Sequence, residues 1–247
     1  MAQPTPFPDF QSEFFRLYHG GHYQQALDWL RSAEIRYPQQ AAALVFWRMC
    51  VLCLLGQPDP AVQALEQGLE AGLWWSEKLL REEGDLAALL GRPDFENLAI
   101  LSGERQQQIQ AHSEPAMLVY APEDQPDGPA PLLVALHSRY SSAPEIAGRF
   151  RHLTRSGWLV AVPQSSQVAY PGAYGWDDPQ RAGQEIAELL ARLQDEAWID
   201  DQNLVLAGFS QGGALALELA LSGKIQACGV LGIAPYLRDL ARLEQAP

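Results

Sequence analysis

The chain has 247 residues, of which 47% are hydrophobic, and a formal net charge of −13. This length accommodates one large domain or two small ones. The charge argues against nucleic acid or anionic membranes as partners, because their phosphates would be repelled. No apolar run reaches the roughly 18 residues of a membrane span, and the N-terminus lacks a signal-peptide pattern, so we expect a cytoplasmic protein.

The three cysteines are too few for a disulfide framework. Cys50 and Cys53 form a C-x-x-C pair, but they lie in the apolar run ALVFWRMCVLCLLG, which predicts a buried helix. The sequence therefore favours core thiols over a redox or metal pair. We expect no metal and no organic cofactor, because the sequence contains no cluster of metal-ligating residues.

Apolar residues recur at helical spacing through residues 1–100, which we interpret as a helical domain. Within it, GHYQQALDWLRSA at residues 21–33 aligns with GQPDPAVQALEQG at residues 56–68. The first copy resembles the second helix of a tetratricopeptide repeat, whereas the second departs from that pattern at Pro58 and Gly68. The matching positions are Gly21, Tyr23, Ala26, Leu30, Ala33 and Pro38. The resemblance implies a groove for a protein partner, and the alternative is a helical appendage that packs on its neighbour.

Residues 101–113 are polar at first and are interpreted as a linker or a solvated helix. Residues 114–247 follow a different pattern, in which short apolar runs alternate with amphipathic helices. The runs AMLVYAP, PLLVALH, WLVAVPQ, NLVLAGFS and QACGVLGIAP predict strands. This alternation is typical of an α/β fold with a parallel sheet covered by helices on both faces.

The segment LVLAGFSQGGALALELA contains a G-x-S-x-G motif centred on Ser210. The motif follows an apolar strand and precedes an amphipathic helix, which is the setting of a nucleophile elbow. Gly208 and Gly212 would keep the turn free of side chains that collide with the backbone. Ser210 would then lie at a helix N-terminus, where N–H groups favour an oxyanion. The alternative is an ordinary turn in which Ser210 caps the helix.

Four motifs, LHSRYSS, VPQSSQ, YGWDD and GFSQGG, resemble the phospholipase/carboxylesterase branch of the α/β-hydrolase superfamily. The resemblance implies that Ser210 is the nucleophile and that the backbone N–H groups of Gln211 and Arg139 form the oxyanion hole. It also implies an ester or thioester substrate, with Trp176 and Asp177 near its entrance. His137 and Tyr140 are further candidates for substrate binding, although Ser138 and Tyr140 stand where the family has glycines.

His137 follows a strand directly and is expected to order the adjoining loop by hydrogen bonding. His19, His22, His112 and His152 also lack the expected position, because the order in this fold is serine, acid, histidine. Asp239 is the only Asp after Ser210 and is expected to be a solvated charge. The triad acid and base are therefore missing.

Two interpretations of the missing triad remain open. The first is a fragment of a longer hydrolase, truncated at its C-terminal end and inactive or weakly active alone. The second is a protein-interaction module with a catalytically silent hydrolase-like domain.

Overall fold

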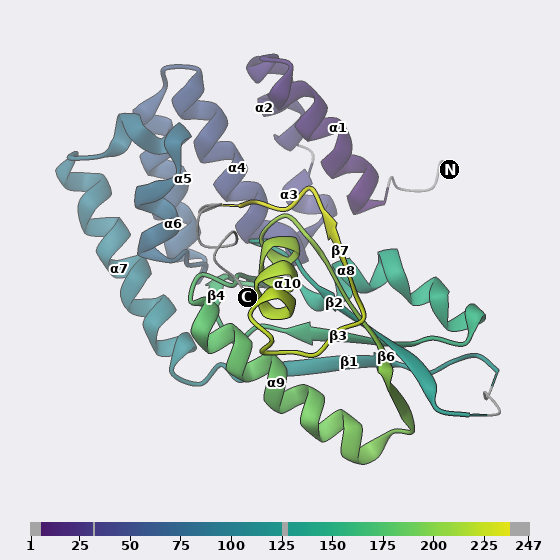
Figure 1. The fold of residues 1–247 in the computed structure, drawn as a ribbon. Coiled ribbons are helices and arrows are strands. Elements are labelled where there is room, and N and C mark those ends of the chain that lie inside the picture. Colours follow the sequence, from purple (N-terminus) through teal and green to yellow (C-terminus); the bar gives the residue numbers. More distant parts are fainter. Residues whose placement is uncertain (1–5, 32, 125–127, 238–247) are drawn as a thin grey trace. The chain divides into compact units, whose positions relative to one another are not determined.

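The computed structural model describes residues 6–31, 33–124 and 128–237 (Figure 1). By its internal contacts the chain divides into two compact units, Met1–Ile109 and Gln110–Pro247.

The first unit is built from helices, as the periodicity of its apolar residues predicts. Helix α1 packs on α2, α2 on α4, and α4 on α5. That these helices form tetratricopeptide repeats stays a prediction. The final helix runs on through the polar segment to Gln110, so most of the expected linker is helical. The helices are α1 Phe7–His19, α2 Tyr23–Arg31, α3 Ala33–Arg36, α4 Ala41–Leu54, α5 Pro58–Glu70, α6 Glu77–Glu82 and α7 Pro93–Gln110, with 3-10 turns η1 Pro38–Gln40 and η2 Gly84–Leu89.

The packing of this unit explains Gly68 and confirms the buried thiols. A Cβ on Gly68 would lie 2.6 Å from the ring of Trp75. The indole N–H of Trp75 donates to the carbonyl of Ala42, which fixes the ring in that place. Cys50 and Cys53 are both buried in α4, and burial raises the pKa of Cys53 to about 11.

The second unit contains a five-stranded sheet in the order β1-β3-β2-β6-β7. Its strands are β1 Ala116–Tyr120, β2 Ala130–Leu136, β3 Leu159–Gln164, β6 Ile199–Phe209 and β7 Gly229–Ile233, and a separate hairpin pairs β4 Val168–Tyr170 with β5 Ala173–Tyr174. The expectation of a wholly parallel sheet is corrected by β1, which is antiparallel to β3. Strand β1 lies at the edge of the sheet, beside β3.

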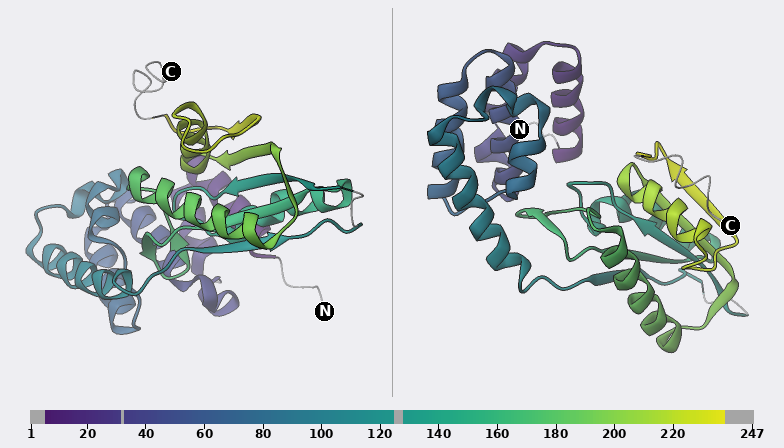
Figure 2. Two further views of the ribbon diagram at one scale, coloured as in Figure 1. Left: turned by 60° about the horizontal axis from the view of Figure 1, so that its bottom comes forward. Right: turned by 60° about the vertical axis from the view of Figure 1, so that its left-hand side comes forward.

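Helices cover both faces of this sheet (Figure 2). Alternate residues of β2 point to opposite faces. Leu132, Val134 and Leu136 pack with α9 (Pro179–Glu196) and α10 (Gln211–Leu221), which lie next to each other on one side. Leu133 and Ala135 pack with α8 (Ala143–Phe150) on the other side of the sheet. The 3-10 turn η3 (Arg151–Ser156) follows α8 in the chain.

Strands β2 and β6 are parallel neighbours, with Leu136 opposite Gly208, so the loops after them leave the same sheet edge. The turn from β6 into α10 approaches the end of β2 closely. A Cβ on Gly212 would lie 2.3 Å from the carbonyl oxygen of His137, and one on Gly208 would lie 2.4 Å from the backbone of Gly212. The sequence-based steric reason for both glycines is thus confirmed.

We predict that Gly212→Ala lowers the free energy of unfolding by at least ~2 kcal/mol, because its methyl group would collide with backbone that cannot move away. Gly148→Ala is the matched control: Gly148 lies in α8, and an added Cβ there meets nothing within 4 Å. This substitution should stabilise the protein by ~0.5–1 kcal/mol. Urea denaturation measures both values, and equal effects of the two substitutions would contradict the packing described.

Candidate active site

Ser210 is in a strained backbone conformation between β6 and α10. Its φ is 52° and its ψ is −116°, a combination that costs a residue with a side chain ~1–3 kcal/mol. Hydrogen bonds hold the backbone in place, because the Ser210 N–H donates to the carbonyl of Ile233 (3.0 Å) and the Ser210 carbonyl accepts from the N–H of Tyr236 (3.1 Å). These bonds offset the cost of the strain.

The hydroxyl of Ser210 is not used to cap the helix. Although Ser210 occupies the N-cap position of α10, its side chain makes no cap hydrogen bond, and none reaches it from another residue in the described ranges. The Ser210 side chain therefore does not cap the helix, and the nucleophile role of Ser210 stays a prediction. What the turn provides is a hydroxyl group beside the first N–H groups of a helix, which have no carbonyl partners in the preceding turn.

The loop after β2 bends without the glycines expected there. Tyr140 takes a left-handed φ of 61°, which a glycine would adopt at less cost. The loop is held by Tyr174, whose carbonyl accepts from the Tyr140 N–H (2.8 Å) and whose N–H donates to the carbonyl of Ser141 (3.0 Å). The guanidinium of Arg139 lies 4.6 Å from the centre of the Tyr140 ring. The departure from the glycine pattern therefore still permits a turn.

His137 is fully buried, and both of its ring nitrogens are in hydrogen bonds. Nδ1 lies 2.9 Å from the carbonyl oxygen of Ser138, so it is the donor, and Nε2 accepts from the backbone N–H of Ser165 (3.3 Å). The side chain of Gln164 also reaches Nε2 (3.3 Å). Burial lowers the pKa of His137 to about 4, although the bond to Ser138 opposes this shift. The imidazole is thus neutral at pH 7 and connects the loops after β2 and β3.

Trp176 and Asp177, from the loop between β5 and α9, occupy different environments. The ring of Trp176 is buried, stacks on His137 with a centroid separation of 4.5 Å, and donates through its indole N–H to the His137 carbonyl (2.8 Å). Asp177 is partly exposed and accepts from the side chains of Gln211 (2.8 Å) and Arg139 (3.2 Å). The structure therefore brings Arg139, Asp177 and Gln211 together beside Ser210.

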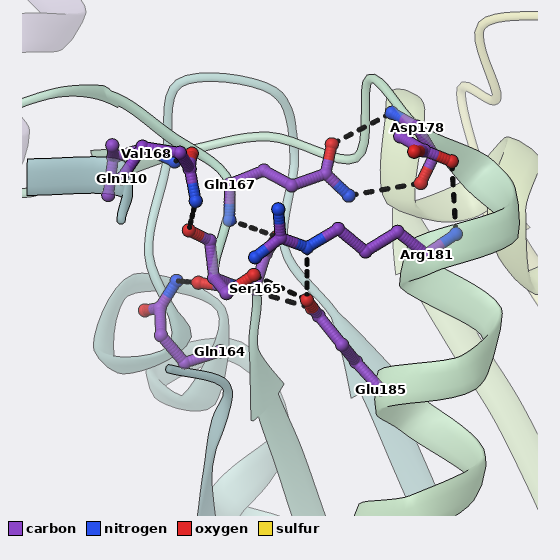
Figure 3. A network of polar contacts seen from close by, with 9 residues as sticks. Gln110, Gln164, Ser165, Gln167, Val168, Asp178, Arg181 and Glu185 are labelled. Carbon is purple, nitrogen blue, oxygen red and sulfur yellow. Dashed lines mark hydrogen bonds and ion pairs between the residues drawn. The ribbon is translucent and has the colours of Figure 1, made fainter. Parts of the chain in front are cut away.

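A buried polar network next to this site was missed from the sequence (Figure 3). The carboxylate of Glu185 on α9 accepts from the hydroxyl and the N–H of Ser166 and from the guanidinium of Arg181. The Ser165 hydroxyl accepts from the N–H of Gln167. The network ties the VPQSSQ loop to α9. The sequence does contain a signal for this network. Glu185 lies on the same face of α9 as the apolar residues Ala182 and Ile186, where an acidic side chain is unexpected.

The other histidines divide between the two units. His19 ends α1 and His22 precedes α2 in the first unit. In the second unit, His112 lies in a turn and His152 in η3, and neither of them, like His137, makes a hydrogen bond to the Ser210 hydroxyl. Asp239 lies outside the described residues. No group of three or more metal-ligating side chains occurs in the ranges that the structure covers, and no helix there is long and apolar enough to cross a membrane.

Two protein families match the chain. The family described as Phospholipase/Carboxylesterase matches residues 177–247, and the one described as A/B hydrolase-like, N-terminal domain, matches residues 9–110. The first match includes Asp177, Ser210 and Gln211 but begins after Arg139. It supports a hydrolase of the esterase kind. The search of curated proteins finds no match.

The comparison with solved structures gives matches of low identity. An uncharacterised protein from Bacillus cereus ATCC 10987 is 19% identical with a TM-score of 0.45, over 97% of this chain and 77% of that one. Acetyl xylan esterase from Aspergillus awamori is 18% identical (TM-score 0.42) over 49% of this chain and 47% of its own. Esterase PE8 is 18% identical (TM-score 0.45) over 54% of this chain and 68% of its own. This chain thus spans about half of the acetyl xylan esterase that it matches.

The low pKa of His137 makes stability depend on pH. Between pH 6.5 and pH 4 the unfolded chain binds a proton that the folded imidazole does not, so the free energy of unfolding falls by about 3 kcal/mol as the pH decreases through this window. We predict that the stability advantage of the native protein over His137→Asn, measured by urea denaturation, shrinks by this amount. An advantage that stays constant with pH would contradict the buried neutral imidazole.

Proposed function

We propose that this protein is a serine hydrolase of the carboxylesterase or thioesterase type, in which Ser210 receives the acyl group of a small-molecule substrate. The observation that carries the proposal is the strained Ser210, whose hydroxyl has no structural partner among the described residues. A fold keeps such strain where it serves a function. The Phospholipase/Carboxylesterase match over residues 177–247 supports the same reaction class.

In the proposed reaction, Ser210 Oγ attacks the carbonyl carbon while a base takes its proton. The negative charge that develops on the carbonyl oxygen is stabilised by the backbone N–H groups of Gln211, at the start of α10, and of Arg139, after β2. The bond to the leaving alcohol or thiol then breaks, and the leaving group takes up the proton. Water hydrolyses the acyl-serine in the second half of the reaction, which releases the acid.

The proposed base is an imidazole supplied from outside these 247 residues. The second unit contains His112, His137 and His152, and none of these three bonds to Ser210. His137 follows β2, the strand beside β6, but its two nitrogens are occupied and burial lowers its pKa to about 4, so it is a poor proton acceptor at neutral pH. The 247-residue chain alone is therefore expected to react slowly with an ester or thioester.

We predict that a fluorophosphonate probe labels the natural full-length protein at Ser210 and that Ser210→Ala abolishes the labelling. The 247-residue chain alone should label at least ~100-fold more slowly, because general-base assistance contributes this much or more. Mass spectrometry of the labelled peptide identifies the modified residue.

The matched control is Ser222→Ala at the other end of α10, where the hydroxyl bonds to the carbonyl of Leu219. This variant should label like the unmodified protein. Absence of labelling in the natural protein, or labelling that persists in Ser210→Ala, would contradict the proposal and favour a catalytically silent domain.

A further inference from the structure

We propose that Asp177 is a positioning residue that holds the two halves of the oxyanion hole at a fixed separation. The inference rests on the proposed function for the identity of that hole, but it is carried by a separate set of contacts. These contacts link three segments that are distant in sequence: the loop after β2, the loop before α9, and the first residue of α10.

The two donor residues lie in loops that leave two neighbouring strands of the sheet. Gln211 follows β6 and Arg139 follows β2, and each loop leaves its strand after the last paired position, Leu136 opposite Gly208. Their backbone N–H groups must nevertheless point at one oxygen atom for the hole to work. Errors of about 1 Å in such a position cost roughly 100-fold in rate.

Asp177 binds the side chains of both donors with one carboxylate. Its Oδ1 accepts from Nε2 of Gln211 at 2.8 Å, and its Oδ2 accepts from Nη2 of Arg139 at 3.2 Å. Nε of Arg139 also lies 3.2 Å from Oδ1, so the contact is an ion pair. About three-quarters of each charged side chain is shielded, with exposed fractions of 24% for Arg139 and 28% for Asp177. Charge-assisted bonds of this kind are stronger and more directional than neutral ones.

The preceding residue, Trp176, also forms hydrogen bonds to the start of α10 and to the loop after β2. Its backbone N–H donates to Oε1 of Gln211 at 2.9 Å, so that amide group is held at both of its ends. Its indole N–H donates to the carbonyl of His137 at 2.8 Å, at the start of the Arg139 loop. Because Trp176 is buried and hydrogen-bonded, it restrains the backbone next to Asp177 and thereby the position of the Asp177 carboxylate.

The test measures the rate of fluorophosphonate labelling at Ser210 in the natural full-length protein and in two variants. Asp177→Ala should label roughly 10- to 100-fold more slowly, because both donors lose their common support. Asp178→Asn is the matched control: it removes the same charge from the next residue, which caps α9 by accepting from the Arg181 N–H. This control should stay within about threefold. An effect of Asp177→Ala below tenfold, or an equal effect of Asp178→Asn, would overturn the proposal.

Amide hydrogen exchange provides a second readout that does not need activity. The N–H groups of Tyr140 and Ser210 are hydrogen-bonded, one in each loop, so both should exchange faster in Asp177→Ala. In Asp177→Asn the oxygen that Gln211 binds remains and the ion pair to Arg139 is lost, so faster exchange is expected at Tyr140 alone. If the natural protein is not labelled at Ser210, the proposed function fails. The amide hydrogen exchange rates of Tyr140 and Ser210 then test whether Asp177 positions the two loops. Acceleration of both amides by Asp177→Ala, but not by Asp178→Asn, then supports the positioning role, and any other pattern overturns it.

Discussion

The close approach of the turn after β6 to the end of β2 is the constraint on which the site depends. Gly212 passes so near the His137 carbonyl that no Cβ fits between them, and this contact places α10 directly behind the loop that begins at His137. The turn can be this tight only because Ser210 accepts a strained backbone, held by its hydrogen bonds to Ile233 and Tyr236. One packing contact thereby sets the position of both the serine and the loop opposite it.

Buried polar groups then fix the loops that surround this turn. The neutral imidazole of His137 connects the loop after β2 to the loop after β3, and the Glu185 network connects the latter to α9. Asp177 and Trp176 complete the ring of contacts by reaching Gln211. Each of these groups is satisfied by partners on a different element, so the loops support one another and not only their own strands.

The local parts of this arrangement could be predicted from the sequence, because each depends on neighbours along the chain. The elbow follows from GFSQGG between an apolar strand and a helix, and the buried thiols follow from an unbroken apolar run. The antiparallel β1, the left-handed Tyr140 and the Glu185 network could not, because each depends on a partner far away in sequence: β3 for the strand, Tyr174 for the bend, and Ser166 for the acid. A motif in the sequence pointed to Asp177, whereas its contacts with Gln211 and Arg139 depend on how the fold brings distant segments together.

We propose that Ser210 and the backbone N–H groups of Gln211 and Arg139 act on one substrate carbonyl. A crystal structure of the natural protein after reaction with a phosphonate ester would test this arrangement. We expect a phosphorus atom bonded to Ser210 Oγ, with its phosphoryl oxygen about 2.7–3.1 Å from both backbone nitrogens. An adduct on another residue, or a phosphoryl oxygen that points into solvent, would contradict it.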